Sequence, residues 1–174
     1  MPKVALSPRV YIACLACYNA GKHEGEWFDA IEGLCQEHET WHEAHVKAIG
    51  ENHEEYLVHD YEGFGSFKMG EVSPQEAEKI GAFIEEHGIP GALALDNCGG
   101  DVDDAAVCME SYQGAHDSLA DWAESWAQDC YDLKGMGNLA NYIDWERYAE
   151  DCRMGGDIWY EEGEDGMVHV FDNH

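Results

Sequence analysis

The chain has 174 residues, with 37 acidic against nine basic side chains and a formal net charge of −28 at pH 7. Its 45% hydrophobic and 11% aromatic content is too high for an intrinsically disordered chain. The charge excludes direct binding to nucleic acid or to anionic membrane surfaces, because both need basic patches. No apolar run approaches the ~20 residues of a membrane span. The length allows one domain or up to three small ones.

The cysteines have no regular framework spacing; they are Cys14, Cys17, Cys35, Cys98, Cys108, Cys130 and Cys152. A chain of this length can build a core without disulfides, so we expect reduced thiols and a cytoplasmic protein. Lys3 and Arg9, followed by residues 10–17, faintly resemble a signal peptide. The apolar run is short and interrupted by tyrosines, which argues against that interpretation.

The chain is expected to begin with two strands. Residues 9–18 are rich in β-formers, residues 19–22 have turn chemistry, and residues 26–30 read as a strand that pairs back on the first. Cys14 and Cys17 form a C-x-x-C pair, which can be half a zinc site or a redox pair. On a strand, residues three apart point to opposite faces. The pattern therefore favours buried strand cysteines over a metal site.

A helix is predicted over residues 31–49, because its apolar and histidine residues recur on one stripe. Residues 38–42, HETWH, match the H-E-x-x-H pattern of zinc hydrolases, in which the histidines bind zinc and the glutamate is the general base. With ten His and 37 acids in the chain, this pattern easily arises by chance, and we favour a His-rich inner helix face. A zinc-dependent hydrolase using His38, Glu39 and His42 is the alternative function. Metal binding by these histidines and His45 stays open.

A third strand is predicted at residues 54–62 and completes an N-terminal α+β domain, residues 1–72. Ser73-Pro74-Gln75-Glu76 is a capping box that opens the next helix, which Gly88 ends. A short helix is expected at residues 91–97. This helical part, residues 73–113, forms the predicted central domain.

The stretch DNCGGDVDD at residues 96–104 resembles a calcium loop, but Cys98 and Gly100 stand where ligands belong. We interpret it as a loop that caps a helix whose apolar stripe runs from Val102 to Tyr112. The predicted C-terminal domain, residues 114–174, contains helices at 117–132 and 139–154, joined by a linker, and then a hairpin of residues 157–161 and 167–171. The predicted fold class is α+β, an elongated chain of small subdomains with an N-terminal three-stranded sheet.

The acids are concentrated where the chain can still fold. Residues 71–132 hold fifteen acids and one base, Lys79, together with many apolar residues. A rigid surface of one sign repels itself, and ordinary surface helices carry compensating bases, so this surface points to a positively charged partner such as a DNA-binding protein. The acids expected to form the partner-binding surface are Glu76, Glu85, Glu86, Asp101, Asp103, Asp104, Glu110, Asp117, Asp121, Glu124 and Asp132.

Three segments resemble the ArdA antirestriction proteins of plasmids and conjugative transposons. They are residues 10–28, with VYIA and a closing WF; residues 55–62, EYLVHDYE; and residues 141–151, NYIDWERYAED. The third resembles the family's antirestriction motif, with Trp145 where a Tyr is usual. The resemblance assigns to that motif Asn141, Tyr142, Asp144, Tyr148 and Asp151.

The resemblance implies an elongated homodimer whose acids imitate the phosphates of bent B-form DNA. Such a protein occupies the DNA-binding groove of a type I restriction–modification enzyme, with no catalysis and no cofactor. We assign no metal site from the sequence. The charge agrees, since −28 matches roughly 48 Å of duplex at one charge per ~1.7 Å. Cys14, Cys17 and the histidines at 38, 42 and 45 depart from the family pattern.

Two other functions are compatible with the composition. A protein adapted to high salt is also acidic, and it would unfold in dilute buffer. A calcium-binding or chaperone-like protein would change its melting temperature with calcium.

Overall fold

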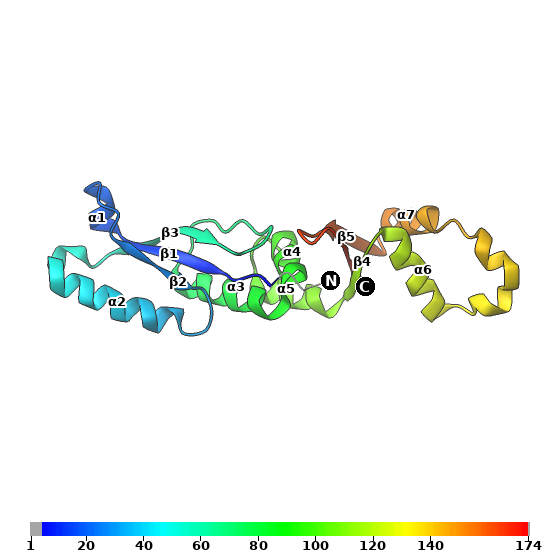
Figure 1. Cartoon of the computed structure of the whole chain (residues 1–174), viewed down its shortest axis with the longest axis horizontal. Helices are drawn as coiled ribbons and strands as arrows, with labels where there is room; N and C mark the ends of the chain where they lie inside the picture. The colour runs from blue at the N-terminus through cyan, green and yellow to red at the C-terminus, as the bar shows by residue number, and fades with distance from the viewer. Residues whose placement is uncertain (1–4, 174) are drawn as a thin grey trace. The chain divides into compact units, whose positions relative to one another are not determined.

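The computed structural model describes residues 5–173, and its chain divides into two compact units. The N-terminal unit is Met1–Ala105 and the C-terminal unit is Ala106–His174. Figure 1 shows their helices and strands in chain order. The fold is α+β, as predicted, with an antiparallel three-stranded sheet in each unit. The division into domains 1–72, 73–113 and 114–174 stays a prediction.

The sheet of the N-terminal unit has the order β2-β1-β3. β1 (Arg9–Cys14) pairs antiparallel with β2 (Gly25–Asp29) on one side and β3 (Tyr56–Glu62) on the other. All three strands were predicted. The first is shorter than expected, because Leu15–Asn19 form a short helix, α1, in place of further strand. Cys14 therefore ends a strand and Cys17 lies in a helix, so the prediction that both are strand cysteines is wrong.

Helices complete the N-terminal unit. α2 (Leu34–Ile49), α3 (Pro74–His87) and α4 (Ile89–Asn97) match the predicted helices within a few residues. The capping box at Ser73 forms as predicted, with its hydroxyl accepting from the Glu76 N–H. Six of the nine residues of α4 are buried, so this helix lies inside the unit along most of its length. Together with β1 it supplies much of the core.

Two contacts hold α3 against the segment that leads into α2. A Cβ built on Gly81 of α3 would lie 1.7 Å from the carbonyl oxygen of Ala30, so only glycine permits this close approach. The Glu78 carboxylate accepts hydrogen bonds from the N–H groups of Gly33 and Cys35, at 3.0 and 3.1 Å. It thus caps the start of α2, which has no side-chain cap of its own.

The next helix, α5 (Val102–Glu110), contains the boundary between the units. Asp101 caps it, because its Oδ1 accepts from the N–H groups of Asp103 and Asp104 at 2.9 and 3.0 Å. The stretch around Asp101 is therefore the helix-capping loop that its sequence predicted. The predicted continuation of this helix to Tyr112 is wrong, because the chain leaves the helix after Glu110.

Tyr112 instead begins β4 (Tyr112–His116), which the sequence did not predict. β4 pairs with β6 (Val168–Asp172), and β6 pairs with β5 (Ile158–Glu162), giving the order β4-β6-β5. The predicted C-terminal hairpin is confirmed, with each strand starting one residue later. β4 adds a strand because Tyr112 can pack on Phe171 and donate its hydroxyl hydrogen toward His169 Nδ1, 2.8 Å away.

Two helices pack beside this sheet. α6 (Leu119–Cys130) lies within the predicted helix 117–132, and Ser118 caps it. The predicted helix 139–154 is wrong in its first part: residues 133–142 form the 3-10 segment η2 (Leu133–Tyr142), interrupted by a left-handed glycine. α7 (Trp145–Gly155) starts afresh, because Asp144 accepts from the Arg147 N–H at 3.0 Å. The core between helices and sheet is Trp122, Ala123, Ala149, Ile158, Val168 and Val170.

None of the described helices combines the length and the apolar character needed to cross a membrane.

Candidate partner-binding surface

The eleven acids predicted to form a partner-binding surface are all exposed. Six of them belong to α3, to α5 or to the loop before α5, within the N-terminal unit: Glu76, Glu85, Glu86, Asp101, Asp103 and Asp104. The other five belong to the C-terminal unit: Glu110, Asp117, Asp121, Glu124 and Asp132. A partner can reach these acids only if they are exposed, and the acids of both units meet this condition.

Several of these carboxylates also hold local structure. Glu76 accepts from the N–H and the hydroxyl of Ser73, both at 2.8 Å, and these bonds lower the pKa of its carboxyl group. Asp101 caps α5, and Asp132 accepts from the Gly135 N–H at 3.0 Å. The hydroxyl of Ser118 donates to Asp121 at 2.5 Å. These hydrogen bonds fix the carboxylates in place while leaving them open to solvent.

The other seven acids have no such capping role among the described residues. They are Glu85, Glu86, Asp103, Asp104, Glu110, Asp117 and Glu124. Within residues 5–173, Glu124 is the only one of the seven whose side chain has a hydrogen bond, which it accepts from the Gln128 amide at 3.4 Å. Their charges are therefore available to a partner without any structural change in this chain.

Ion pairs among the described residues also leave these charges unneutralised. In residues 5–173, the ion pairs join Arg9 to Asp29 and Glu62, Arg153 to Glu150, and His169 to Asp165. None of the eleven surface acids takes part in them. Lys79, the single base of residues 71–132, only assists in lowering the pKa of Glu76. The bases that form ion pairs thus pair with acids outside the predicted surface.

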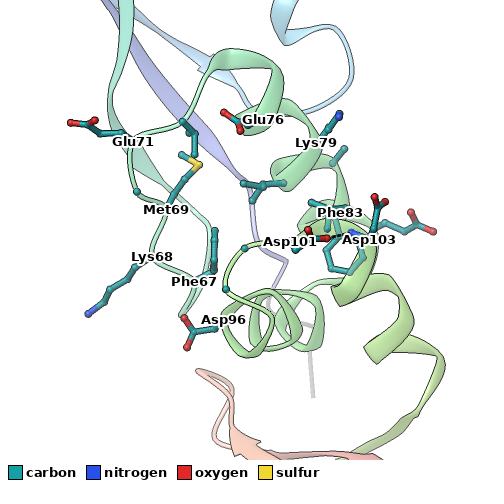
Figure 2. A pocket seen from close by; sticks show the side chains of 18 residues that line it. Phe67, Lys68, Met69, Glu71, Glu76, Lys79, Phe83, Asp96, Asp101 and Asp103 are labelled. Carbon is teal, nitrogen blue, oxygen red and sulfur yellow. Dashed lines mark hydrogen bonds between the residues drawn. The ribbon is translucent and has the colours of Figure 1, made fainter.

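A groove of about 860 Å³ opens on the N-terminal unit between α3, the start of α5 and residues 67–72. Figure 2 shows its lining, in which buried Phe67, Met69 and Phe83 supply apolar surface. Carboxylates surround the opening, and they include four of the predicted acids. The acids that line the groove are Glu71, Glu76, Glu86, Asp96, Asp101 and Asp103. Lys68 and Lys79 also line the groove. With six acids against two bases, it suits a long cationic side chain, whose stem is apolar and whose head is charged.

The residues of the antirestriction-like motif separate into two groups. Asn141, Tyr142 and Asp151 are exposed, and Tyr142 is 85% accessible. Tyr148 packs on Trp126 and Trp145 beside the C-terminal core, and burial strongly raises its pKa. Asp144 is exposed but caps α7.

The H-E-x-x-H residues do not form an open metal site. His38 is 1% exposed, and burial lowers its pKa to about 4. The Nε2–H of His42 donates to the backbone carbonyl of His53 at 3.0 Å, while Glu39 is exposed on the helix. A hydrolytic zinc site needs ligands around a position that substrate and water can reach. The buried His38 does not provide one.

His45 instead faces a different set of side chains. In the part of the chain that the structure describes, potential metal ligands gather at Cys14, Cys17, His45 and His53, whose ligand atoms all lie within 4.8 Å of one another. The sequence reasoning missed this group because it extended β1 through Cys17. The C-x-x-C spacing was the signal that could have found it.

A family model described as "Antirestriction protein (ArdA)" matches residues 10–168. The matched range includes the three segments on which the sequence resemblance rested, and it extends through both compact units. Searches of curated proteins and of solved structures gave no match.

Proposed function

Because the chain belongs to the ArdA family of antirestriction proteins, we propose that it inhibits type I restriction–modification enzymes by imitating bent B-form DNA. Its exposed carboxylates take the place of phosphates, and the protein occupies the DNA-binding groove of the enzyme in the cytoplasm. The observation that carries this proposal is the set of eleven exposed acids, none of which pairs with a base of its own chain among the described residues.

The unpaired state of these acids matters for energetic reasons. An acid already in an ion pair gives a partner less electrostatic energy, because its own base must first be displaced or shared. Free carboxylates interact with the lysines and arginines of a DNA-binding groove much as phosphates do. Their summed field also accelerates the encounter, and salt screens this effect.

The spacing of the acids supports the same function. On α6, Asp121 and Glu124 lie three residues apart, about 4.5 Å along the helix axis at 1.5 Å per residue. Duplex DNA presents one charge per ~1.7 Å of axis when both strands are counted. Several helices that each present a few carboxylates are needed to reach that density, and α3, α5 and α6 each carry such acids.

Inhibition by occupancy requires no catalytic residue and no cofactor. The groove between α3 and α5 would receive lysine or arginine side chains of the enzyme. The exposed motif residues Asn141 and Asp151 would add contacts from the C-terminal unit, while Asp144 and Tyr148 maintain α7.

We also propose that the protein acts as a homodimer. Large hydrophobic side chains are exposed in residues 131–142, including Leu139 at 67% and Tyr142 at 85%. A second copy would cover them and double the charge offered to the enzyme. Light scattering coupled to size exclusion tests this, and Leu139→Asp combined with Tyr142→Ser should give monomers. A wild-type protein that is already monomeric at micromolar concentration contradicts it.

A competition assay tests the proposed inhibition. A type I restriction–modification enzyme is held on labelled DNA, and the protein is titrated in at two salt concentrations. We expect displacement of DNA at stoichiometric amounts of protein, with weaker binding at the higher salt concentration. Displacement that does not depend on salt contradicts electrostatic mimicry, and failure to displace DNA from any type I enzyme contradicts the proposed target.

A matched variant pair separates mimicry from general acidity. Neutralising unpaired acids by Glu85→Gln, Glu86→Gln and Asp103→Asn should weaken displacement. Neutralising three ion-paired acids by Asp29→Asn, Glu62→Gln and Glu150→Gln changes the net charge equally and should have a smaller effect. Equal losses in both variants would mean that only total charge matters.

A further inference from the structure

Four potential metal ligands from separate parts of the N-terminal unit meet at one point. Cys14 ends β1, Cys17 lies in α1, His45 is near the end of α2, and His53 lies in the short 3-10 helix η1 (Glu51–His53). Both cysteines are buried, and both histidines are half-buried. Because β1 gives way to α1 after Cys14, the two sulfurs face the same point.

The distances between these ligand atoms match those around a tetrahedral ion. His53 Nδ1 lies 3.3 Å from Cys14 Sγ and 3.4 Å from Cys17 Sγ, and His45 Nε2 lies 3.7 Å from Cys17 Sγ. With Zn–S near 2.3 Å and Zn–N near 2.0–2.1 Å, tetrahedral geometry separates a bound sulfur from a bound nitrogen by about 3.6 Å. The observed values lie on either side of this distance.

Hydrogen bonds, including one between Cys17 and Cys14, satisfy only some of these contacts at one time. A neutral imidazole nitrogen without hydrogen has one lone pair and accepts one S–H. His53 Nδ1 nevertheless has both sulfurs at nearly the same distance. An ion placed between the four atoms explains why the two cysteines and both histidines converge.

We propose that Cys14, Cys17, His45 and His53 bind one Zn²⁺ ion in a closed structural site. Two thiolates and two imidazoles are a ligand set that zinc prefers, and two thiolates balance the charge of the ion. All four coordination positions are supplied by the protein. The site is therefore suited to stabilising the fold and leaves no position for a substrate.

Neighbouring residues support the ligands. His42 donates its Nε2–H to the carbonyl of His53 and so holds η1 against α2. The Trp41 ring stacks on His45, with centroids 5.2 Å apart and planes 13° apart. Gly50, at φ 118°, permits the sharp turn between α2 and η1 that returns His53 toward the cysteines. The histidines of the H-E-x-x-H pattern thus lie beside the proposed site and not in it.

The ion would stabilise elements that are weak by themselves. α1 has five residues and η1 has three, and helices of such length do not persist in isolation. Zinc would fasten both to β1 and to the end of α2. Since binding energy of a structural metal is folding energy, removal of the ion should loosen this end of the N-terminal unit.

Metal content tests the proposal directly. The full chain is purified under reducing conditions, and zinc is measured by mass spectrometry against protein concentration. We expect one zinc per chain that survives dialysis against a weak chelator. The Co²⁺-substituted protein should show the visible absorption of a tetrahedral ion with thiolate ligands. Removal of zinc by a strong chelator should lower the Tm by at least about 4 °C.

Variants locate the ion. Cys17→Ser and His45→Gln should each reduce bound zinc at least tenfold. The matched controls Cys130→Ser and His59→Gln change an exposed cysteine and an exposed histidine and should retain it. His38→Gln should also retain it, because His38 is not among the four ligands.

Several results would overturn the proposal. Zinc lost on mild dialysis, or bound equally by Cys17→Ser, would mean adventitious binding by histidines. Loss of zinc in His38→Gln but not in Cys17→Ser would place the ion in the H-E-x-x-H pattern. A Cys14–Cys17 disulfide in the protein purified without reductant, together with no zinc under reducing conditions, would mean a redox pair. The Co²⁺ spectrum of the wild-type chain decides the ligand type even if a variant misfolds.

Discussion

The two units carry a similar excess of acid but differ in the surface they expose. The N-terminal unit has 21 acidic and six basic residues, and the C-terminal unit has 16 and three. Of the large hydrophobic side chains that the structure describes as exposed, only Tyr18 and Ile49 lie in the N-terminal unit. The C-terminal unit exposes Val107, Tyr131, Met136, Leu139, Tyr142 and Met154.

This difference separates two tasks. In our proposal the electrostatic task is shared, because each unit presents carboxylates that no base in the described chain neutralises. The exposed apolar surface lies mostly on the C-terminal unit, which is where an interface with a second copy is to be expected. The N-terminal unit has the larger buried core and, in our proposal, the zinc site.

The largest expected effect comes from neutralising the acids of one unit at a time. The N-terminal set changes Glu85, Glu86, Asp103 and Asp104 to amides, and the C-terminal set changes Glu110, Asp117 and Glu124. None of these seven is a cap, so both proteins should fold normally. At ~0.2–1 kcal/mol for each exposed charge pair, the four N-terminal changes should weaken binding to the restriction enzyme by about 1–4 kcal/mol.

The C-terminal set should weaken binding by a slightly smaller amount, and the combined variant by about the sum. Equilibrium competition against labelled DNA measures both, with circular dichroism as a check on folding. If one set has no effect while the other abolishes binding, the electrostatic task is not shared and a single unit carries the contact.

Gly81→Ala should have a smaller effect, which is a loss of stability confined to the N-terminal unit. The added Cβ would lie 1.7 Å from the Ala30 carbonyl oxygen, so α3 must move away from the segment before α2. We expect a loss of about 1–3 kcal/mol in the free energy of unfolding, which is typical of overpacking. Gly70→Ala is the control, because nothing lies within 4 Å of its Cβ.

Tryptophan fluorescence distinguishes the units when the tryptophans of one unit are replaced by Phe, because Trp27 and Trp41 lie in the N-terminal unit and the others in the C-terminal unit. The cluster of Trp122, Trp126 and Tyr148 reports on the C-terminal unit. The urea concentration at which the C-terminal unit is half unfolded should not change in Gly81→Ala if the units unfold separately. A parallel shift of both transitions would mean that the two units are one cooperative body.

The Glu78 cap predicts a pH dependence for the same unit. Hydrogen bonds from the Cys35 side chain and from the Gly33 N–H lower the pKa of Glu78, against the opposing effect of burial. A group with a lowered folded pKa stabilises the protein above its unfolded pKa, and this contribution is lost as pH falls through the folded pKa. Glu78→Gln should therefore destabilise the protein at neutral pH, by about 1–2 kcal/mol as for other caps.

The loss in free energy of unfolding caused by Glu78→Gln should shrink as the pH is lowered, because the wild-type carboxylate then becomes protonated and, like the glutamine, uncharged. Urea denaturation of both proteins from neutral pH down to about pH 3 checks this. Glu85→Gln, on the exposed side of the same helix, is the control and should show no such trend. A deficit that is constant with pH would mean that Glu78 acts through packing alone.

Much of this fold follows from local patterns. The capping box at Ser73, the strands around Val10, and the C-terminal hairpin were predictable because each depends on residues close in sequence. β4 was not, because its partner strand β6 lies more than fifty residues away and Tyr112 fits a helical stripe equally well. The role of Glu78 was likewise hidden, since its partners Gly33 and Cys35 belong to another helix.

The candidate surface could be predicted from the sequence, whereas the candidate metal site could not. Exposure of the acids was predictable because carboxylates are seldom buried without partners. The cluster around His53 was not, because it depends on the chain turning into α1 after Cys14 and back at Gly50. The three segments indicated the family, but they gave no indication of how histidines of α2 and η1 meet the cysteines.

The smallest expected effect is that of one acid alone. Glu124→Gln removes an exposed carboxylate that has only a long contact with Gln128. With binding energy spread over both units, we expect a loss of no more than about 1 kcal/mol in affinity for the enzyme and no change in stability. Asp121→Ala is the comparison on the same helix, since it also removes the contact with Ser118. A single change at Glu124 that abolishes inhibition would replace the distributed surface with a hot spot on α6, and the C-terminal unit would then hold both the charge contact and the apolar one.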